Sequence, residues 1–141
     1  MKKIIIINGP NLNLLGKREP HIYGEKTFEG YFEEIQSLFK SSVDLSLFQS
    51  NHEGEIIDKL HQTGFSFDGI IMNAGALSHT SFAIADAIAA IDTPVLEVHI
   101  SNIHAREEFR EKTVTGNHCV GIITGLGLYG YTAGIHYFLQ S

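Results

Sequence analysis

Glu97 and His99 lie two positions apart in an apolar stretch, and their side chains could carry acid–base chemistry. On a β-strand, positions 97 and 99 point to one face, whereas Leu96 and Val98 point to the other. A carboxylate beside an imidazole fixes the tautomer of the ring and favours its protonated form, which can act as an acid. The same spacing also fits a purely structural ion pair, so both interpretations stay open.

Arg18 and Tyr23 form a second candidate pair. They lie in a polar segment, residues 8–26, that is long for a connection in a compact domain and is typical of a lid or binding loop. Ionising a free tyrosine at pH 7 costs about 4 kcal/mol, and a cation within about 4–6 Å lowers the pKa of an acid by roughly 1–3 units. Beside Arg18, Tyr23 could therefore remove a carbon-bound proton, although an aromatic lid contact also explains it.

Amide and imidazole side chains follow two of the expected strands. Three asparagines, among them Asn11, leave the first strand and supply hydrogen-bond donors and acceptors, although turn chemistry explains any one of them. Asn73 and His79 bound a later loop, in which the backbone amides of residues 76–79 suit an anion at the start of the next helix. A hydrogen-bonded loop without a ligand is the alternative.

Asp86 and Arg110 can each be explained in two ways. Asp86 stands alone in the apolar helix expected at residues 82–91, where it either marks the solvent side or reaches the pocket of a neighbouring subunit. Arg106 and Arg110 are four positions apart and would share one helical face. Adjacent glutamates favour a solvated ion-pair face, whereas Arg110 could instead bind hydroxyls or a carboxylate with two hydrogen bonds.

Two further patterns point away from cofactor chemistry. Residues 125–130 match the glycine pattern of dinucleotide-binding folds, but only 11 residues follow and none is acidic. A tight turn with close helix–strand packing is the favoured interpretation. His99 and His104 are five apart, which does not suit two metal ligands on one helical face, so we expect no metal.

The single cysteine, Cys119, lies in an apolar run and is expected to be a core thiol.

The elements that must position these residues alternate between strands and helices. Apolar runs predict strands at residues 3–7, 43–48, 69–72, 94–100 and 119–124. Helical periodicity predicts helices after Thr27, after a capping box at Ser50 and Glu53, at 82–91 and from Gly130 onward. The alternation predicts an α/β flavodoxin-like fold, a five-stranded parallel sheet of order 2-1-3-4-5 with helices on both faces. Ligands of such sheets bind beyond the carboxyl ends of the strands, where the candidate residues lie.

Composition limits the class of protein. The 141 residues, of which 43% are hydrophobic and 18% charged, fit one domain over residues 1–141 with a lid loop at about 16–25. The net charge of -6 argues against nucleic acid or an anionic membrane as a partner. No segment approaches the roughly 20 apolar residues of a membrane span, and the apolar run at 4–7 is too short for a signal peptide. We therefore expect a cytoplasmic protein.

Motifs that run in order across nearly the whole chain resemble one enzyme family. They comprise residues 8–16, 18–20, 23–24, 73–76, 79–81, 97–102, 106–110 and 125–131. Together they resemble type II 3-dehydroquinate dehydratases. The chain departs from the family pattern at residues 111–113, where a serine is usual and Thr113 keeps the hydroxyl. It departs again at residues 131–135, where the family usually has a Leu-Ala-Leu-like run.

The resemblance implies a reaction and an assembly. The family converts 3-dehydroquinate to 3-dehydroshikimate by overall anti elimination through an enolate, in the shikimate pathway of aromatic amino acid biosynthesis. It uses no metal and no cofactor. Its members form homododecamers built from trimers, so we expect copies of this chain as its partners. The rival hypotheses are another lyase or isomerase on the same frame and a flavodoxin-like binding or signalling module.

The resemblance also implies a role for each site residue. Tyr23 would remove the C2 proton, Arg18 would lower the pKa of Tyr23, and Asn11 would help to stabilise the enolate. His99 would protonate the departing C1 hydroxyl while Glu97 holds it. The residues that would bind the substrate are Asn73, His79, Asp86 from an adjacent subunit, Ile100, Ser101 and Arg110.

Overall fold

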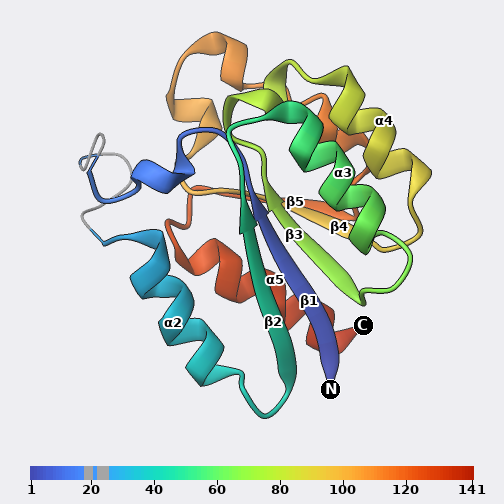
Figure 1. The fold of residues 1–141 in the computed structure, drawn as a ribbon. Coiled ribbons are helices and arrows are strands. Elements are labelled where there is room, and N and C mark those ends of the chain that lie inside the picture. The colour runs from blue at the N-terminus through green and yellow to red at the C-terminus, as the bar shows by residue number, and fades with distance from the viewer. Residues whose placement is uncertain (18–20, 22–25) are drawn as a thin grey trace.

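The computed structural model describes residues 1–17, 21 and 26–141. In this part of the chain, parallel strands form a five-stranded sheet of order β2-β1-β3-β4-β5 (Figure 1). The strands are β1 (Lys2–Asn8), β2 (Val43–Gln49), β3 (Gly69–Asn73), β4 (Val95–His99) and β5 (Gly121–Thr124). The predicted fold class and strand order are confirmed, although β5 begins two residues later than predicted.

Helices cover both faces of the sheet (Figure 1). Helices α2 (Phe28–Leu38) and α5 (Tyr129–Gln140) pack on one face, and α3 (Glu53–Thr63) and α4 (Phe82–Ala90) pack on the other. Because helices cover both faces, the carboxyl ends of the strands are the edge of the sheet at which polar loops can gather.

In the described part of the chain, no helix is long and apolar enough to cross a membrane.

Four consecutive isoleucines in β1 show why this strand lies inside the sheet, between β2 and β3. Ile4 and Ile6 contact the α2 and α5 layer, whereas Ile5 and Ile7 contact the α3 and α4 layer, and all four are buried. Successive side chains of a strand point to opposite faces, so a strand covered on both sides needs an unbroken apolar run. The run at residues 4–7 thus belongs to a doubly covered strand, as the sequence predicted.

The start of α2 was predicted correctly, but the start of α3 was not. The Thr27 hydroxyl caps α2 by accepting the Gly30 amide hydrogen at 3.2 Å. The predicted capping box at Ser50 is wrong, because α3 begins at Glu53 with His52 as its N-cap.

Ser50 and Glu53 have other partners. The Ser50 hydroxyl accepts the amide hydrogen of His52 and donates to the Glu55 carboxylate. The Glu53 carboxylate accepts a hydrogen bond from Ser81, the N-cap of α4. The two residues therefore shape the loop before α3 and join α3 to α4, a tertiary contact that the local pattern does not encode.

The glycine-rich segment after β5 is a tight turn, as predicted. Gly125 and Gly127 have φ values of 85° and 62°, in the left-handed region that favours glycine. Their amides donate to the carbonyls of His99 and Ile100 at 3.2 and 3.0 Å. A Cβ on Gly130 would lie 3.1 Å from the Val98 side chain, which reflects close packing of α5 on β4. The turn thus supports the backbone just after β4.

Candidate functional site

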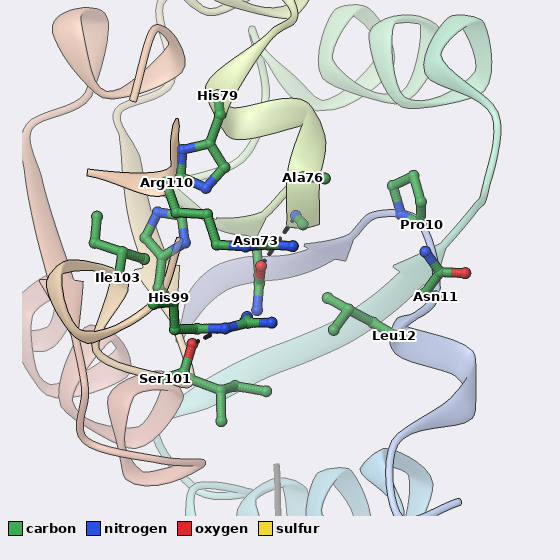
Figure 2. Close-up of a pocket in the computed structure, with 13 residues that line it drawn as sticks. Pro10, Asn11, Leu12, Asn73, Ala76, His79, His99, Ser101, Ile103 and Arg110 are labelled. Carbon is green, nitrogen blue, oxygen red and sulfur yellow. Dashed lines mark hydrogen bonds between the residues drawn. The ribbon is translucent and has the colours of Figure 1, made fainter. Parts of the chain in front are cut away.

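A cavity lies beyond the carboxyl ends of β1, β3 and β4 (Figure 2). The structure brings together there seven of the residues that the sequence singled out: Asn11, Asn73, His79, His99, Ile100, Ser101 and Arg110. Asn73 and His99 are the last residues of β3 and β4. Because parallel strands end at the same edge of the sheet, residues far apart in the chain meet at one place.

Glu97 and His99 form a buried pair beside this cavity. His99 Nε2 lies 2.9 Å from Glu97 Oε2, and the two residues are 5% and 0% exposed. The prediction that both point to one face of β4 is confirmed. The contact occupies Nε2, so Nδ1 is the ring nitrogen that remains for a ligand in the cavity.

Thr115 holds the other side of Glu97 and was missed by the sequence analysis. Its hydroxyl donates to Glu97 Oε1, and Thr115 is fully buried in the 3-10 helix η5 (Thr115–His118). The two residues are 18 positions apart, so no spacing rule links them. Both oxygens of the carboxylate are hydrogen-bonded, which fixes the plane in which it meets His99.

His79 faces the cavity as a neutral hydrogen-bond acceptor. Its Nδ1–H donates to the Lys112 carbonyl, with an N···O distance of 2.7 Å, which leaves the lone pair on Nε2. Burial is the main cause that lowers the pKa of His79 below 6.5. The ring also stacks on that of His99, with centroids 5.8 Å apart. His79 can therefore accept a hydrogen bond from a hydroxyl group.

Asn73 is fixed at both atoms of its amide group. Its Oδ1 accepts the Gly75 amide hydrogen at 3.1 Å, and its Nδ2 donates to the Tyr131 hydroxyl at 3.0 Å (Figure 2 shows the former). The backbone around it differs from the prediction, because residues 75–79 form a short 3-10 helix, η2 (Gly75–His79), that is separate from α4. The amides of 76–79 thus do not begin the long helix.

Arg106 and Arg110 both line the cavity, but the prediction that they share one helical face is wrong. Extended backbone at Arg106 separates two 3-10 turns, η3 (Ile103–Ala105) and η4 (Glu108–Arg110). Glu107 Oε1 lies 3.8 Å from Arg106 Nε and 3.3 Å from Arg110 Nε. The pKa of Glu107 is lowered, first by a hydrogen bond from its own backbone amide and then by the hydrogen bond from the Arg110 side chain. Arg106, which the sequence analysis gave no role at the site, also donates to Ser101 Oγ at 3.4 Å.

Asn11 lines the cavity on the side that follows β1. It adopts a left-handed conformation with φ 71°, which asparagine tolerates better than most residues. Its backbone amide donates to Asn51 Oδ1 at 3.0 Å. The loop after β1 is therefore anchored to the loop after β2.

One predicted residue within the described part of the chain lies away from the cavity, and two more fall outside that part. Asp86 is exposed on α4 and does not line the cavity. Arg18 and Tyr23 lie outside the described residues, as does most of the predicted lid at 16–25.

Cys119 is half-buried rather than a core residue. It packs against the α3 and α4 layer, and burial followed by the charge of Glu97 raises the pKa of its thiol to about 12. Such a thiol stays protonated and unreactive at neutral pH. Over residues 1–17, 21 and 26–141, no group of three or more His, Cys, Asp or Glu could hold a metal ion.

Comparisons with known proteins agree with one another. A family model described as "Dehydroquinase class II" matches residues 2–139. A 3-dehydroquinate dehydratase of Helicobacter hepaticus is 54% identical over 140 residues, which cover 98% of this chain and 89% of the relative. One from an Exiguobacterium species is 51% identical over 138 residues, which cover 98% and 94%. A crystal structure of type II dehydroquinase from Butyrivibrio crossotus has a TM-score of 0.95 at 48% identity, covering 99% of this chain and 98% of that one.

Proposed function

Because the chain belongs to the class II dehydroquinase family, we propose that it dehydrates 3-dehydroquinate to 3-dehydroshikimate. It is an enzyme of the hydro-lyase type, since relatives of about the same length carry that activity in their names. The finer proposal is an overall anti elimination through an enolate. It would serve the shikimate pathway of aromatic amino acid biosynthesis in the cytoplasm.

The observation that carries the proposal is the buried Glu97–His99 pair at the edge of a cavity lined by two arginines. The cavity contains Arg106 and Arg110, whereas the whole chain has a net charge of -6. A substrate with a carboxylate is therefore attracted locally in spite of the overall charge. The imidazole beside it can supply the proton that a leaving hydroxyl needs.

The proposed reaction has two proton transfers. Tyr23, with its pKa lowered by Arg18, takes the C2 proton, and the electron pair of the C–H bond forms an enolate at the C3 ketone, which Asn11 helps to stabilise. Collapse of the enolate expels the C1 hydroxyl, and His99 gives it a proton so that water leaves. The roles of Tyr23 and Arg18 follow from the family resemblance, because both residues lie outside the described part of the chain.

Binding of the substrate would use the remaining cavity residues. The lone pair on His79 Nε2 and the fixed amide of Asn73 suit ring hydroxyls, and Arg110 can donate to them as well. Ile100 and Ser101, just after β4, would bind the carboxylate through a backbone amide and a hydroxyl. These assignments use only groups that line the cavity.

The proposed assembly is a homododecamer built from trimers, in which Asp86 reaches the cavity of an adjacent subunit. Asp86 is exposed on α4, and Phe82 on the same helix is 70% exposed. An exposed phenylalanine beside a lone carboxylate fits a helix that meets another copy of the chain.

A direct assay tests the proposed function. Purified protein treated with chelator is given 3-dehydroquinate, and the ultraviolet absorbance of the conjugated enone product is followed. We expect turnover that survives chelation and is lost by orders of magnitude in His99→Ala and Tyr23→Phe. Folded wild-type protein that forms no enone would contradict the assignment and favour the binding-module hypothesis.

A further inference from the structure

The Tyr131 hydroxyl lies between two asparagines below the cavity. Tyr131, near the start of α5, is fully buried. Its hydroxyl accepts a hydrogen bond from Asn73 Nδ2 at 3.0 Å and donates one to Asn8 Oδ1 at 2.9 Å. Asn8 and Asn73 end the neighbouring strands β1 and β3 and pair in register. One side chain from the C-terminal helix thus joins the ends of β1 and β3.

The direction of these hydrogen bonds is fixed. A hydroxyl has a single hydrogen, so donation to Asn8 leaves its lone pairs for the amide of Asn73. Burial raises the pKa of Tyr131, so the hydroxyl keeps its hydrogen at working pH. Gly75 holds the other end of the Asn73 amide, through Oδ1. The arrangement leaves one Nδ2 hydrogen of Asn73 for the cavity.

Tyr31 offers a matched hydroxyl without this connection. Its ring centroid lies 6.3 Å from that of Tyr131 in the same buried cluster, and its hydroxyl is hydrogen-bonded to Thr132. Neither Tyr31 nor Thr132 lines the cavity. Removing the Tyr31 hydroxyl should therefore cost about as much stability as removing the Tyr131 hydroxyl, but it leaves the hydrogen bonds of Asn73 intact.

We propose that Tyr131 is a positioning residue that sets the orientation of the Asn73 amide for substrate binding. The inference rests on the proposed function, because it takes Asn73 to bind a hydroxyl of the substrate. Without the Tyr131 hydroxyl, Nδ2 of a buried amide loses its partner, and the amide group turns to find another. The cavity would then lose a donor that had been held in place before the substrate arrived.

The expected kinetic change is in KM. Asn73 would contact the substrate away from the bonds that break, so it contributes equally to binding of the substrate and of the transition state. Losing such a contact raises KM and leaves kcat nearly unchanged. For Tyr131→Phe we expect KM to rise on the order of tenfold, the effect of about one hydrogen bond.

The test combines four variants of the assembled enzyme: Tyr131→Phe, Tyr31→Phe, Asn73→Ala and the double variant Tyr131→Phe with Asn73→Ala. Steady-state kinetics and thermal unfolding are measured for each. The inference predicts a higher KM in Tyr131→Phe but not in Tyr31→Phe, and no further rise when Tyr131→Phe is added to Asn73→Ala. An equal rise in both tyrosine variants, or one that persists without Asn73, would overturn it.

Two further measurements keep the inference testable. If Tyr131→Phe does not fold, Asn8→Ala removes the acceptor of the hydroxyl, and we expect a smaller rise in KM that also vanishes beside Asn73→Ala; an unchanged KM contradicts the inference. If the wild type does not turn over 3-dehydroquinate, the proposed function fails by itself. Crystal structures of wild type and Tyr131→Phe then decide the positioning role, which is overturned if the Asn73 amide keeps its orientation.

Discussion

Glu97 is held from two sides, by His99 on one carboxylate oxygen and by Thr115 on the other. All three residues are buried, so their hydrogen bonds face little competition from water. A hydrogen bond to a buried charged group contributes roughly 1.5–3 kcal/mol. At the scale of single residues, the site therefore depends on a threonine that takes no direct part in the proposed reaction.

Replacing Thr115 tests this dependence. We expect Thr115→Val to lower kcat/KM by about tenfold or more and to lower the melting temperature, because one oxygen of Glu97 loses its donor. Thr115→Ser keeps the hydroxyl and should retain most of the activity. Kinetics of 3-dehydroquinate turnover and thermal unfolding give the two readouts. A valine variant that matches the wild type in both would show that the contact is not needed.

His79 makes stability depend on pH. Its pKa is lower in the folded chain than the value near 6.5 of the unfolded chain, mainly through burial. As the pH falls, His79 therefore takes up a proton more readily in the unfolded chain than in the folded chain. The stability that the neutral ring provides above pH 6.5 is lost progressively below that pH.

We accordingly expect the free energy of unfolding to decrease between pH 7.5 and 5, and to decrease less in His79→Gln. Urea unfolding at several pH values measures both slopes. If the free energy of unfolding changes with pH equally in the two proteins, His79 is excluded as a cause of the pH dependence.

At the scale of elements, the cavity depends on how closely the loops after β1 and β3 approach each other. The Gly9 amide donates to the Asn73 carbonyl at 2.7 Å, and a Cβ on Gly9 would lie 2.6 Å from the Ala74 carbonyl oxygen. Backbone atoms cannot move aside as the end of a flexible side chain can. Glycine at position 9 is thus required where the loop that carries Asn11 meets the loop that follows Asn73 at the end of β3.

A pair of glycine substitutions tests this contact. We expect Gly9→Ala to destabilise the protein by about 1–3 kcal/mol, because the two loops must separate. It should also weaken substrate binding. Gly54→Ala is the control, since a Cβ there meets nothing within 4 Å and alanine is about 1 kcal/mol better than glycine in a helix. Urea unfolding of both variants should give changes of opposite sign, and a neutral Gly9→Ala would contradict the argument.

At the scale of the whole molecule, the exposed carboxylate of Asp86 can contribute to the proposed site only through another copy of the chain. It projects from α4, on the sheet face covered by α3 and α4, and does not line the cavity of its own chain. The proposed trimer would place it at the cavity of a neighbour. Each cavity would then combine residues from two chains.

Mixed assemblies test this sharing. Asp86→Ala and His99→Ala should each be nearly inactive alone. After co-refolding, or dissociation and reassembly, we expect the mixture to regain a measurable fraction of wild-type activity, because some cavities combine an intact His99 with an intact Asp86. Mixing without reassembly is the control. A fully active Asp86→Ala, or no recovery in oligomers shown to be mixed, would contradict the shared site.

The sequence by itself determined the strands, the long helices and most of the cavity, but not the 3-10 helices around it. Apolar runs gave the strands, the alternation of strands and helices predicted the order of the sheet, and the ends of the strands marked Asn73 and His99. The ordered motifs indicated the family, which composition and periodicity alone do not. These features are local or follow from general rules of chain topology, so they can be read without coordinates.

Only the tertiary structure decided the partners of these residues. Thr115 meets Glu97 across 18 positions and Tyr131 meets Asn73 across 58, because packing of α5 and η5 brings them to the ends of β3 and β4. The predicted capping box at Ser50 and Glu53 failed for the same reason, since the Glu53 carboxylate accepts a hydrogen bond from Ser81, the N-cap of a different helix. Buried polar groups take whichever partner the packed chain brings within reach, and that choice depends on distance in space rather than on separation in sequence.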